Sequence, residues 1–150
     1  MTTQAVWLFL AMAFLAGVLM STQAGINGLL AKELSNVLVA TTISFIVGLC
    51  ALLILLMIQR DTFHLSSLKQ LQWWHWIGGL MGAYLVFSAA FVAPRIGALL
   101  FMALVLAGQL FSALVLDHYG WLGFKESAIS WGKIAGLVLI FTGVWLIRRG

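Results

Sequence analysis

Five long apolar segments separated by short polar breaks dominate the chain. The apolar segments are residues 5–30, 37–58, 73–92, 97–116 and 128–147, and the breaks are 32–36, 59–72, 93–95 and 117–127. Each apolar segment approaches or exceeds the length of about 20 residues that a helix needs to cross about 30 Å of hydrocarbon. The pattern therefore predicts five transmembrane helices, forming a single domain over residues 1–150.

The shortest break, Ala93-Pro94-Arg95, decides between four helices and five. Pro94 has no backbone donor and disfavours helical geometry at Ala93. A single helix over residues 73–116 would be about 66 Å long, at about 1.5 Å per residue, and would place Arg95 near its middle. We therefore predict that the third helix ends at residue 92 and the fourth begins at residue 97.

The composition is that of an integral membrane protein. Of the 150 residues, 63% are hydrophobic and only 8% are charged, a balance that a soluble domain of this size could not keep off its surface. The net charge is +4. In a membrane protein this excess indicates attraction to lipid headgroups rather than binding of nucleic acid.

The basic residues are divided equally between the two sides of the membrane. An odd number of spans places the chain termini on opposite faces, and we count Lys133 with the loop before the last helix, toward which its long side chain can extend. One face then receives Arg60, Lys69, Lys125 and Lys133, and the other receives Lys32, Arg95, Arg148 and Arg149. Since an excess of Lys and Arg on one side normally fixes orientation, this chain is expected to insert both ways.

Two copies inserted in opposite senses would form ten spans related by a two-fold axis in the membrane plane. Inverted repeats of this kind allow many secondary transporters to work by alternating access at a site near the midplane. The sequence thus predicts an all-α membrane protein that assembles as an antiparallel, dual-topology homodimer. A pair with an oppositely oriented paralogue is the alternative partner.

Amide side chains inside the predicted spans mark the candidate binding site. Gln23 and Asn27 share one face of the first span, and Gln109 lies deep in the fourth. An amide that faces lipid without a partner costs several kcal/mol, so these side chains must meet protein or a wet cavity. They form hydrogen bonds across helices, or they line a polar midplane cavity. Hydroxyls are expected to support such a cavity at Ser21, Thr41, Ser44 and Ser112.

Glycine stripes on two spans predict close helix packing. In membranes small residues let backbones approach, because lipid provides no hydrophobic drive for association. The expected packing positions are Gly17, Gly25 and Gly28 in the first segment and Gly78 and Gly82 in the third.

Charged and reactive residues exclude several function classes. None of the four carboxylates, at Glu33, Asp61, Asp117 and Glu126, lies inside a predicted span, whereas exporters of hydrophobic cations normally bury one. Neutral or anionic solutes are therefore favoured as substrates.

Asp117 and His118 are adjacent at a helix end without a suitably spaced nucleophile, so no catalytic residue or enzyme activity is predicted. The single cysteine, Cys50, rules out an intramolecular disulfide or a cysteine metal cluster, and we expect no cofactor or metal.

Three sequence motifs resemble the YdcZ-like family of the drug/metabolite transporter superfamily. They are QAGINGLL at residues 23–30, APRIGA at residues 93–98, and GQ at 108–109 followed by Ser112 and DHYG at 117–120. The resemblance implies a bacterial inner membrane protein with five helices, similar to one half of the ten-helix superfamily members. It also extends to the small multidrug resistance exporters. Their essential first-helix carboxylate has no equivalent here, because Gln23 and Asn27 occupy the corresponding polar positions.

We therefore expect a dimeric carrier of small polar solutes, with Gln23, Asn27 and Gln109 lining a midplane cavity. Amides suit this role because they both donate and accept hydrogen bonds. Two other functions remain open on the sequence: a dual-topology ion channel, and a non-transporting subunit that packs against another membrane protein.

Overall fold

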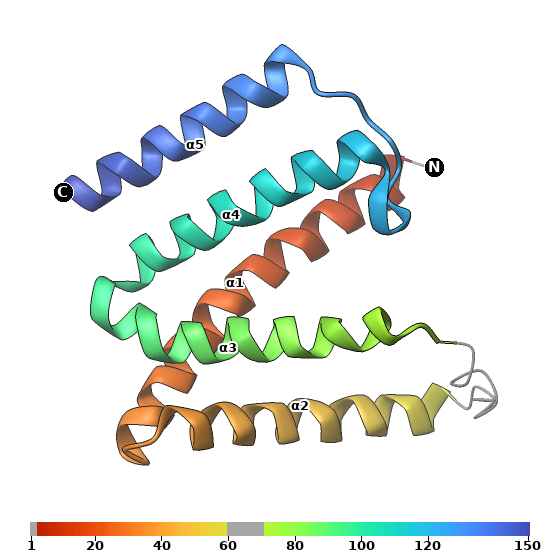
Figure 1. Ribbon diagram of the computed structural model, residues 1–150. Helices are drawn as coiled ribbons and strands as arrows, with labels where there is room; N and C mark the ends of the chain where they lie inside the picture. Colours follow the sequence, from red (N-terminus) through yellow and green to blue (C-terminus); the bar gives the residue numbers. More distant parts are fainter. Residues whose placement is uncertain (1–2, 60–70) are drawn as a thin grey trace. The chain divides into compact units, whose positions relative to one another are not determined.

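The computed structural model describes residues 3–59 and 71–150, and its described elements are all helical (Figure 1). The helices are α1 (Thr3–Glu33), α2 (Val37–Gln59), α3 (Ile77–Ile96), α4 (Ala98–Tyr119) and α5 (Trp131–Arg149). Two short 3₁₀ helices, η2 (Trp73–Trp76) and η3 (Trp121–Gly123), precede α3 and follow α4. Five of the described segments are long and apolar enough to cross a membrane, as predicted. The predicted antiparallel assembly concerns a second chain and stays a prediction.

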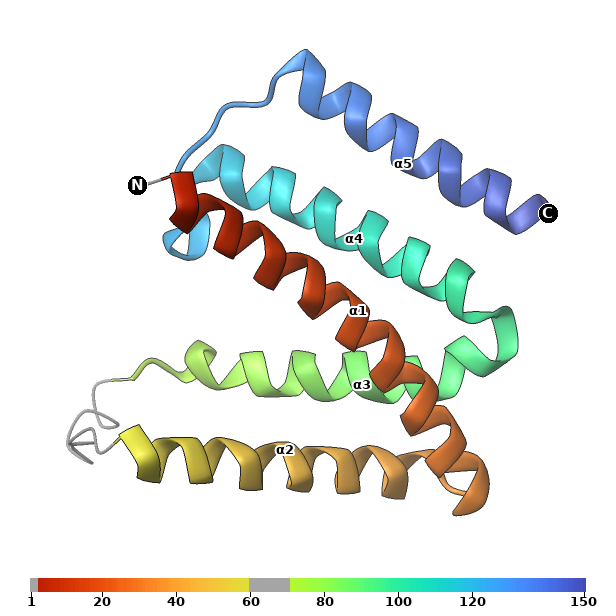
Figure 2. The same ribbon diagram turned by 180° about the vertical axis from the view of Figure 1, so that it is seen from behind.

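The chain divides into two compact units, Met1–Arg95 with α1 to α3 and Ile96–Gly150 with α4 and α5. That the two units form a single domain stays a prediction. In both views α4 and α5 run side by side, joined by the loop that contains η3 (Figure 2). In the first unit α2 and α3 likewise run alongside each other in both views.

A tight turn joins α1 to α2 and packs their ends together. Ser35 adopts a left-handed conformation with φ of 51°, and the N–H of Asn36 donates to the carbonyl of Ala31 at 3.1 Å. The Asn36 side chain then accepts a hydrogen bond from the N–H of Val39 at 3.2 Å, which caps the start of α2. Beyond the turn the helices meet through small buried residues, among them Ala24, Ala31 and Ala40. Small side chains allow this close approach.

The predicted end of the third helix at residue 92 is wrong. The residues Ala93, Pro94 and Arg95 continue α3 to Ile96. Because Pro94 stands in the last turn, it removes only the hydrogen bond that its own N–H would have donated to Ala90, and the helix tolerates the loss. The break comes one turn later at Gly97, whose φ of 89° and ψ of 143° are accessible almost only to glycine.

The predicted start of the last helix at residue 128 is also wrong. Ser130 has extended backbone angles and its hydroxyl accepts a hydrogen bond from the N–H of Lys133 at 3.3 Å, so that α5 begins at Trp131. Ala128 and Ile129 are apolar but precede this cap. Hydrophobicity alone places them in the span, whereas the capping geometry leaves them outside the helix.

The basic residues that the structure describes lie at helix ends or in loops. Lys32, Arg95, Arg148 and Arg149 occupy the last turns of α1, α3 and α5, and Lys125 lies in the loop before α5. Lys133 extends back from α5 as predicted, because its ammonium donates to the carbonyls of Ser127 and Ala128 at 3.1 and 3.0 Å and to the Ser127 hydroxyl at 2.7 Å. Arg60 and Lys69 fall outside the described residues.

Candidate functional site

A polar pair, a buried amide and a half-buried hydroxyl, lies between α1 and α2. The Asn27 side chain is only 3% exposed, and its Nδ2 donates to the Ser44 hydroxyl at 3.2 Å. Asn27 stands on the buried stripe of α1 with Ala24 one turn before it and Ala31 one turn after it. Apolar neighbours therefore leave the amide with one partner from the facing helix. This hydrogen bond links two of the candidate site residues predicted from the sequence.

The pair stands a short distance along both helices from the α1–α2 turn, and its depth in the membrane stays a prediction. Asn27 precedes the end of α1 at Glu33 by six residues, and Ser44 follows the start of α2 at Val37 by seven. At about 1.5 Å per residue the pair lies about 10 Å along the helices from the end of this helical hairpin.

Thr41 lies one turn before Ser44 and is 7% exposed. Its hydroxyl donates to the Val37 carbonyl of its own helix at 2.9 Å, so its hydrogen is already engaged. A hydroxyl bonded in this way still has an oxygen lone pair that can accept from a ligand. Thr41 thus extends the polar face of α2 toward the turn.

Other predicted site residues are exposed on the chain. Gln23 lies ten residues before the end of α1, and Ser21 lies half a turn further from that end. In the second unit, Gln109 is near the centre of α4, and Ser112 follows it. All four side chains are exposed. The structure thus brings together Asn27, Ser44 and Thr41, and leaves the roles of the other four as predictions.

The predicted glycine positions have different surroundings within the first unit. A Cβ atom added to Gly28 would lie 3.1 Å from Cγ of Pro94, and one added to Gly82 would lie 3.9 Å from Cζ of Phe45. The structure therefore uses Gly28 for a close approach of α1 and α3. Added Cβ atoms at three other positions would meet nothing within 4 Å, namely at Gly17, Gly25 and Gly78.

Carboxylates are absent from the middle of every described helix. Glu33 is the last residue of α1, Asp117 lies in the last turn of α4, and Glu126 lies in the loop before α5. Asp61 falls outside the described residues. Within residues 3–59 and 71–150, no group of three or more His, Cys, Asp or Glu side chains is placed to hold a metal ion.

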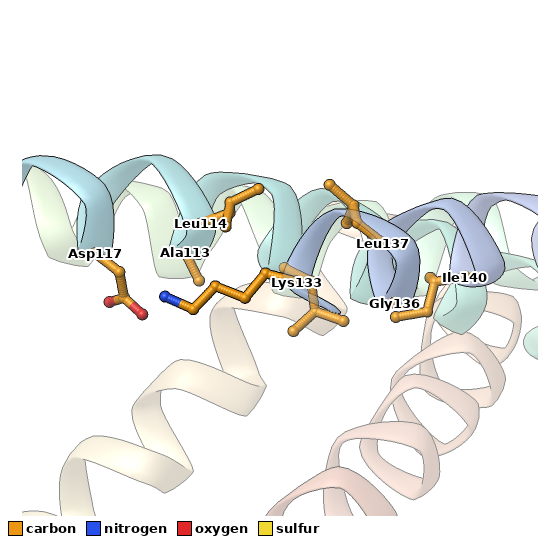
Figure 3. A pocket seen from close by; sticks show the side chains of 8 residues that line it. Ala113, Leu114, Asp117, Lys133, Gly136, Leu137 and Ile140 are labelled. Atoms are coloured by element: carbon orange, nitrogen blue, oxygen red, sulfur yellow. The ribbon is translucent and has the colours of Figure 1, made fainter. Parts of the chain in front are cut away.

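A second feature, a pocket of about 280 Å³ between α4 and α5, was not predicted. Two matching stripes line it, each with spacings of three, one and three residues: Leu110, Ala113, Leu114 and Asp117 on α4, and Lys133, Gly136, Leu137 and Ile140 on α5. Figure 3 shows the side chains of Asp117 and Lys133 extending toward each other at one end. The signal was present in the sequence, since Asp117 ends one apolar helical stripe and Lys133 begins another. From the sequence, Asp117 is expected to be a polar residue at a helix end and part of the DHYG motif, and no pairing with Lys133 is predicted.

Comparisons with known proteins place the chain in a family. The family model described as "Putative inner membrane exporter, YdcZ" matches residues 8–146. The "Inner membrane protein YdcZ" of Escherichia coli (strain K12) is 29% identical over 143 residues, which cover 93% of this chain and 95% of that protein. No solved structure matches. An exporter is not a class of enzyme. The chain therefore belongs to the YdcZ family of the drug/metabolite transporter superfamily and is a multi-pass protein of the bacterial inner membrane.

Proposed function

We propose that this protein is a secondary-type transporter that exports a small polar solute, neutral or anionic, across the inner membrane. The proposal rests on the Asn27–Ser44 pair, in which a buried amide on α1 bonds to a half-buried hydroxyl on α2. Groups of this kind both donate and accept hydrogen bonds and can replace the water around a polar solute. The description of the family as an exporter supports transport out of the cell.

The charges near this pair favour neutral or anionic solutes over cations. Lys32 and Arg95 stand in the last turns of α1 and α3, and Glu33 is the carboxylate beside them on α1. The Arg95 guanidinium donates to the carbonyl of Phe91 and stacks on its ring at 3.7 Å, so its charge is held near the helix end. Two cations and one anion at this end raise the local concentration of anions.

Alternating access requires a second, inverted copy of the chain. Three features support such an assembly: equal numbers of Lys and Arg on the two faces, open surroundings at Gly17 and Gly25, and exposed amides at Gln23 and Gln109. A partner helix would bury these amides, which are costly against lipid. A second copy of this chain is the partner that we propose, and an oppositely oriented paralogue is the alternative.

The depth of the polar pair suggests how the two copies would work together. Each Asn27–Ser44 pair lies about 10 Å from its own hairpin end, so if that end stands at the edge of the hydrocarbon core, two inverted copies place one pair about 5 Å on either side of the midplane. A solute held by one pair at a time would pass from the pair near the cytoplasm to the pair near the periplasm. Rocking of the two subunits would open each side in turn.

Uptake into proteoliposomes from a mixture of solutes tests this function. Vesicles that contain the purified protein are incubated with a bacterial small-molecule extract, and the solutes that enter are identified by mass spectrometry. We expect at least one small neutral or anionic polar solute to enter faster than in empty vesicles. Asn27→Val should abolish the difference. Thr142→Val should retain it, because the exposed Thr142 hydroxyl bonds only to the Val138 carbonyl of its own helix.

Other outcomes identify the competing functions. Entry of hydrophobic cations alone would contradict the proposed substrate class. Single-channel currents in a planar bilayer would indicate an ion channel, because a channel passes far more ions per second than a rocking carrier. The absence of any transported solute, in a preparation that remains folded, would favour a subunit that packs against another membrane protein.

A further inference from the structure

The pocket between α4 and α5 has a polarity gradient along its length. Asp117 and Lys133 form one end, and the rest of the lining consists of leucine, isoleucine, alanine and glycine. The lining extends over eight residues, or seven residue steps, of each helix, from Asp117 to Leu110 and from Lys133 to Ile140. At about 1.5 Å per residue this is about 10 Å along the helices. The charged end lies near the helix ends, at headgroup depth, and the apolar trough extends toward the membrane centre.

The two charged groups have different needs for a partner. The Lys133 ammonium donates to three oxygen atoms of Ser127 and Ala128, so its protons are engaged while its positive charge remains. The Asp117 carboxylate accepts no hydrogen bond from the described residues, although it faces into the pocket (Figure 3). The pocket therefore offers a free acceptor for an N–H donor, beside a positive field that favours an anion.

From this arrangement we propose that the α4–α5 pocket binds a zwitterionic phospholipid with a primary ammonium, the phosphatidylethanolamine class. The lipid ammonium donates to Asp117, the phosphate lies in the field of Lys133, and one acyl chain occupies the trough between Leu114 and Leu137. A freely soluble polar solute would gain nothing from the apolar trough. An anionic phospholipid such as phosphatidylglycerol offers Asp117 no cationic N–H donor, and the Asp117 carboxylate repels its charge.

Native mass spectrometry of the full-length protein, released from detergent and titrated separately with three phospholipids, tests the proposal. We expect phosphatidylethanolamine to bind about tenfold more tightly than phosphatidylcholine, whose quaternary ammonium has no N–H, since a hydrogen bond to a charged group is worth about one decade of affinity. Phosphatidylglycerol should bind no better than phosphatidylcholine. Equal binding of the first two lipids, or a preference for phosphatidylglycerol, would overturn the proposal.

Two charge variants separate the headgroup contacts. Asp117→Asn should reduce the preference for phosphatidylethanolamine over phosphatidylcholine from about tenfold to about onefold. Lys133→Gln should weaken the binding of all three phospholipids to a similar extent. Glu126→Gln and Lys125→Gln change charges in the neighbouring loop, outside the pocket, and should leave the preference intact. An unchanged preference in Asp117→Asn would contradict the assignment of the carboxylate.

A glycine variant tests the trough independently of charge. A Cβ added to Gly136 would meet nothing within 4 Å, so Gly136→Leu should fold while its side chain fills the pocket and lowers phosphatidylethanolamine binding about tenfold. Gly143→Leu is the matched control, because Gly143 lies two turns further along α5, in equally open surroundings and outside the pocket. Equal binding by the two variants would show that no acyl chain lies in the trough. Displacement of the lipid by soluble phosphoethanolamine at equal concentration would likewise contradict a lipid site.

Discussion

Removing the Ser44 hydroxyl tests the hydrogen bond on which the candidate site depends. Ser44→Ala leaves the Asn27 amide, 3% exposed, without its acceptor on α2. An unsatisfied buried donor costs about 1–3 kcal/mol in water-soluble proteins, but hydrogen bonds between membrane helices average about 0.6 kcal/mol with a maximum near 1.7. We therefore expect Ser44→Ala to lower the free energy of unfolding by about 1 kcal/mol, or about fivefold in the unfolding equilibrium constant.

The assay is equilibrium unfolding in mixed micelles with increasing sodium dodecyl sulfate, followed by circular dichroism. A double-mutant cycle with Asn27→Ala isolates the pair, and we expect the two substitutions to be non-additive by about 0.6–1.7 kcal/mol. Thr142→Ala is the control, because its exposed hydroxyl bonds only within α5, and it should change stability by less than about 0.5 kcal/mol. Strictly additive effects of the two substitutions would refute the proposed interaction.

Three further predictions address packing, backbone conformation and orientation. Gly28→Leu should lower the free energy of unfolding by about 1–3 kcal/mol because Pro94 leaves no room for the side chain. Gly48→Leu on α2, where an added Cβ would meet nothing within 4 Å, is the control and should not lower it; equal effects in sodium dodecyl sulfate titrations would contradict this. Gly97→Ala should lower the free energy of unfolding by about 1–3 kcal/mol in the same assay, because the φ of Gly97 is 89°. An unchanged midpoint of the sodium dodecyl sulfate titration would show that glycine is not needed at this position. Lys133→Gln leaves three basic residues on the face with the N-terminus against four on the opposite face. It should therefore increase the fraction of chains whose N-terminus lies outside, as measured by cysteine labelling. An unchanged fraction would show that Lys133 does not influence orientation.

The sequence predicted the helices better than their ends. Runs of apolar residues set the number of spans because a membrane requires about 20 of them for each helix. The ends depend on single residues whose effect is local. Proline usually stops a helix, but in the last turn of α3 the cost of Pro94 is small, and the positive φ of Gly97 stops the helix instead. Ser130 starts α5 three residues after the position that hydrophobicity alone indicates.

The structure contains one contact between residues that the sequence assigns to the candidate site, and their role in binding stays a prediction. The burial cost of an amide correctly indicated that Asn27 needs a protein partner, and Ser44 provides it. The predicted midplane depth of these residues stays a prediction. The pocket at Asp117 and Lys133 was not predicted, because each residue stands at a helix end, beside an apolar stripe on its own helix. The two stripes form a pocket only when α4 and α5 pack together.

Insertion in both orientations is the central claim, and cysteine labelling in intact cells and in inside-out vesicles tests it most directly. Cys50 is replaced by alanine, and single reporters are introduced as Phe124→Cys, in the exposed loop before α5, and as a cysteine appended after Gly150. Neither reporter alters the balance of Lys and Arg. If the chain inserts both ways, an impermeant maleimide will label each reporter from both sides of the membrane. Labelling of each reporter from one side only would contradict the antiparallel homodimer and would require an oppositely oriented partner.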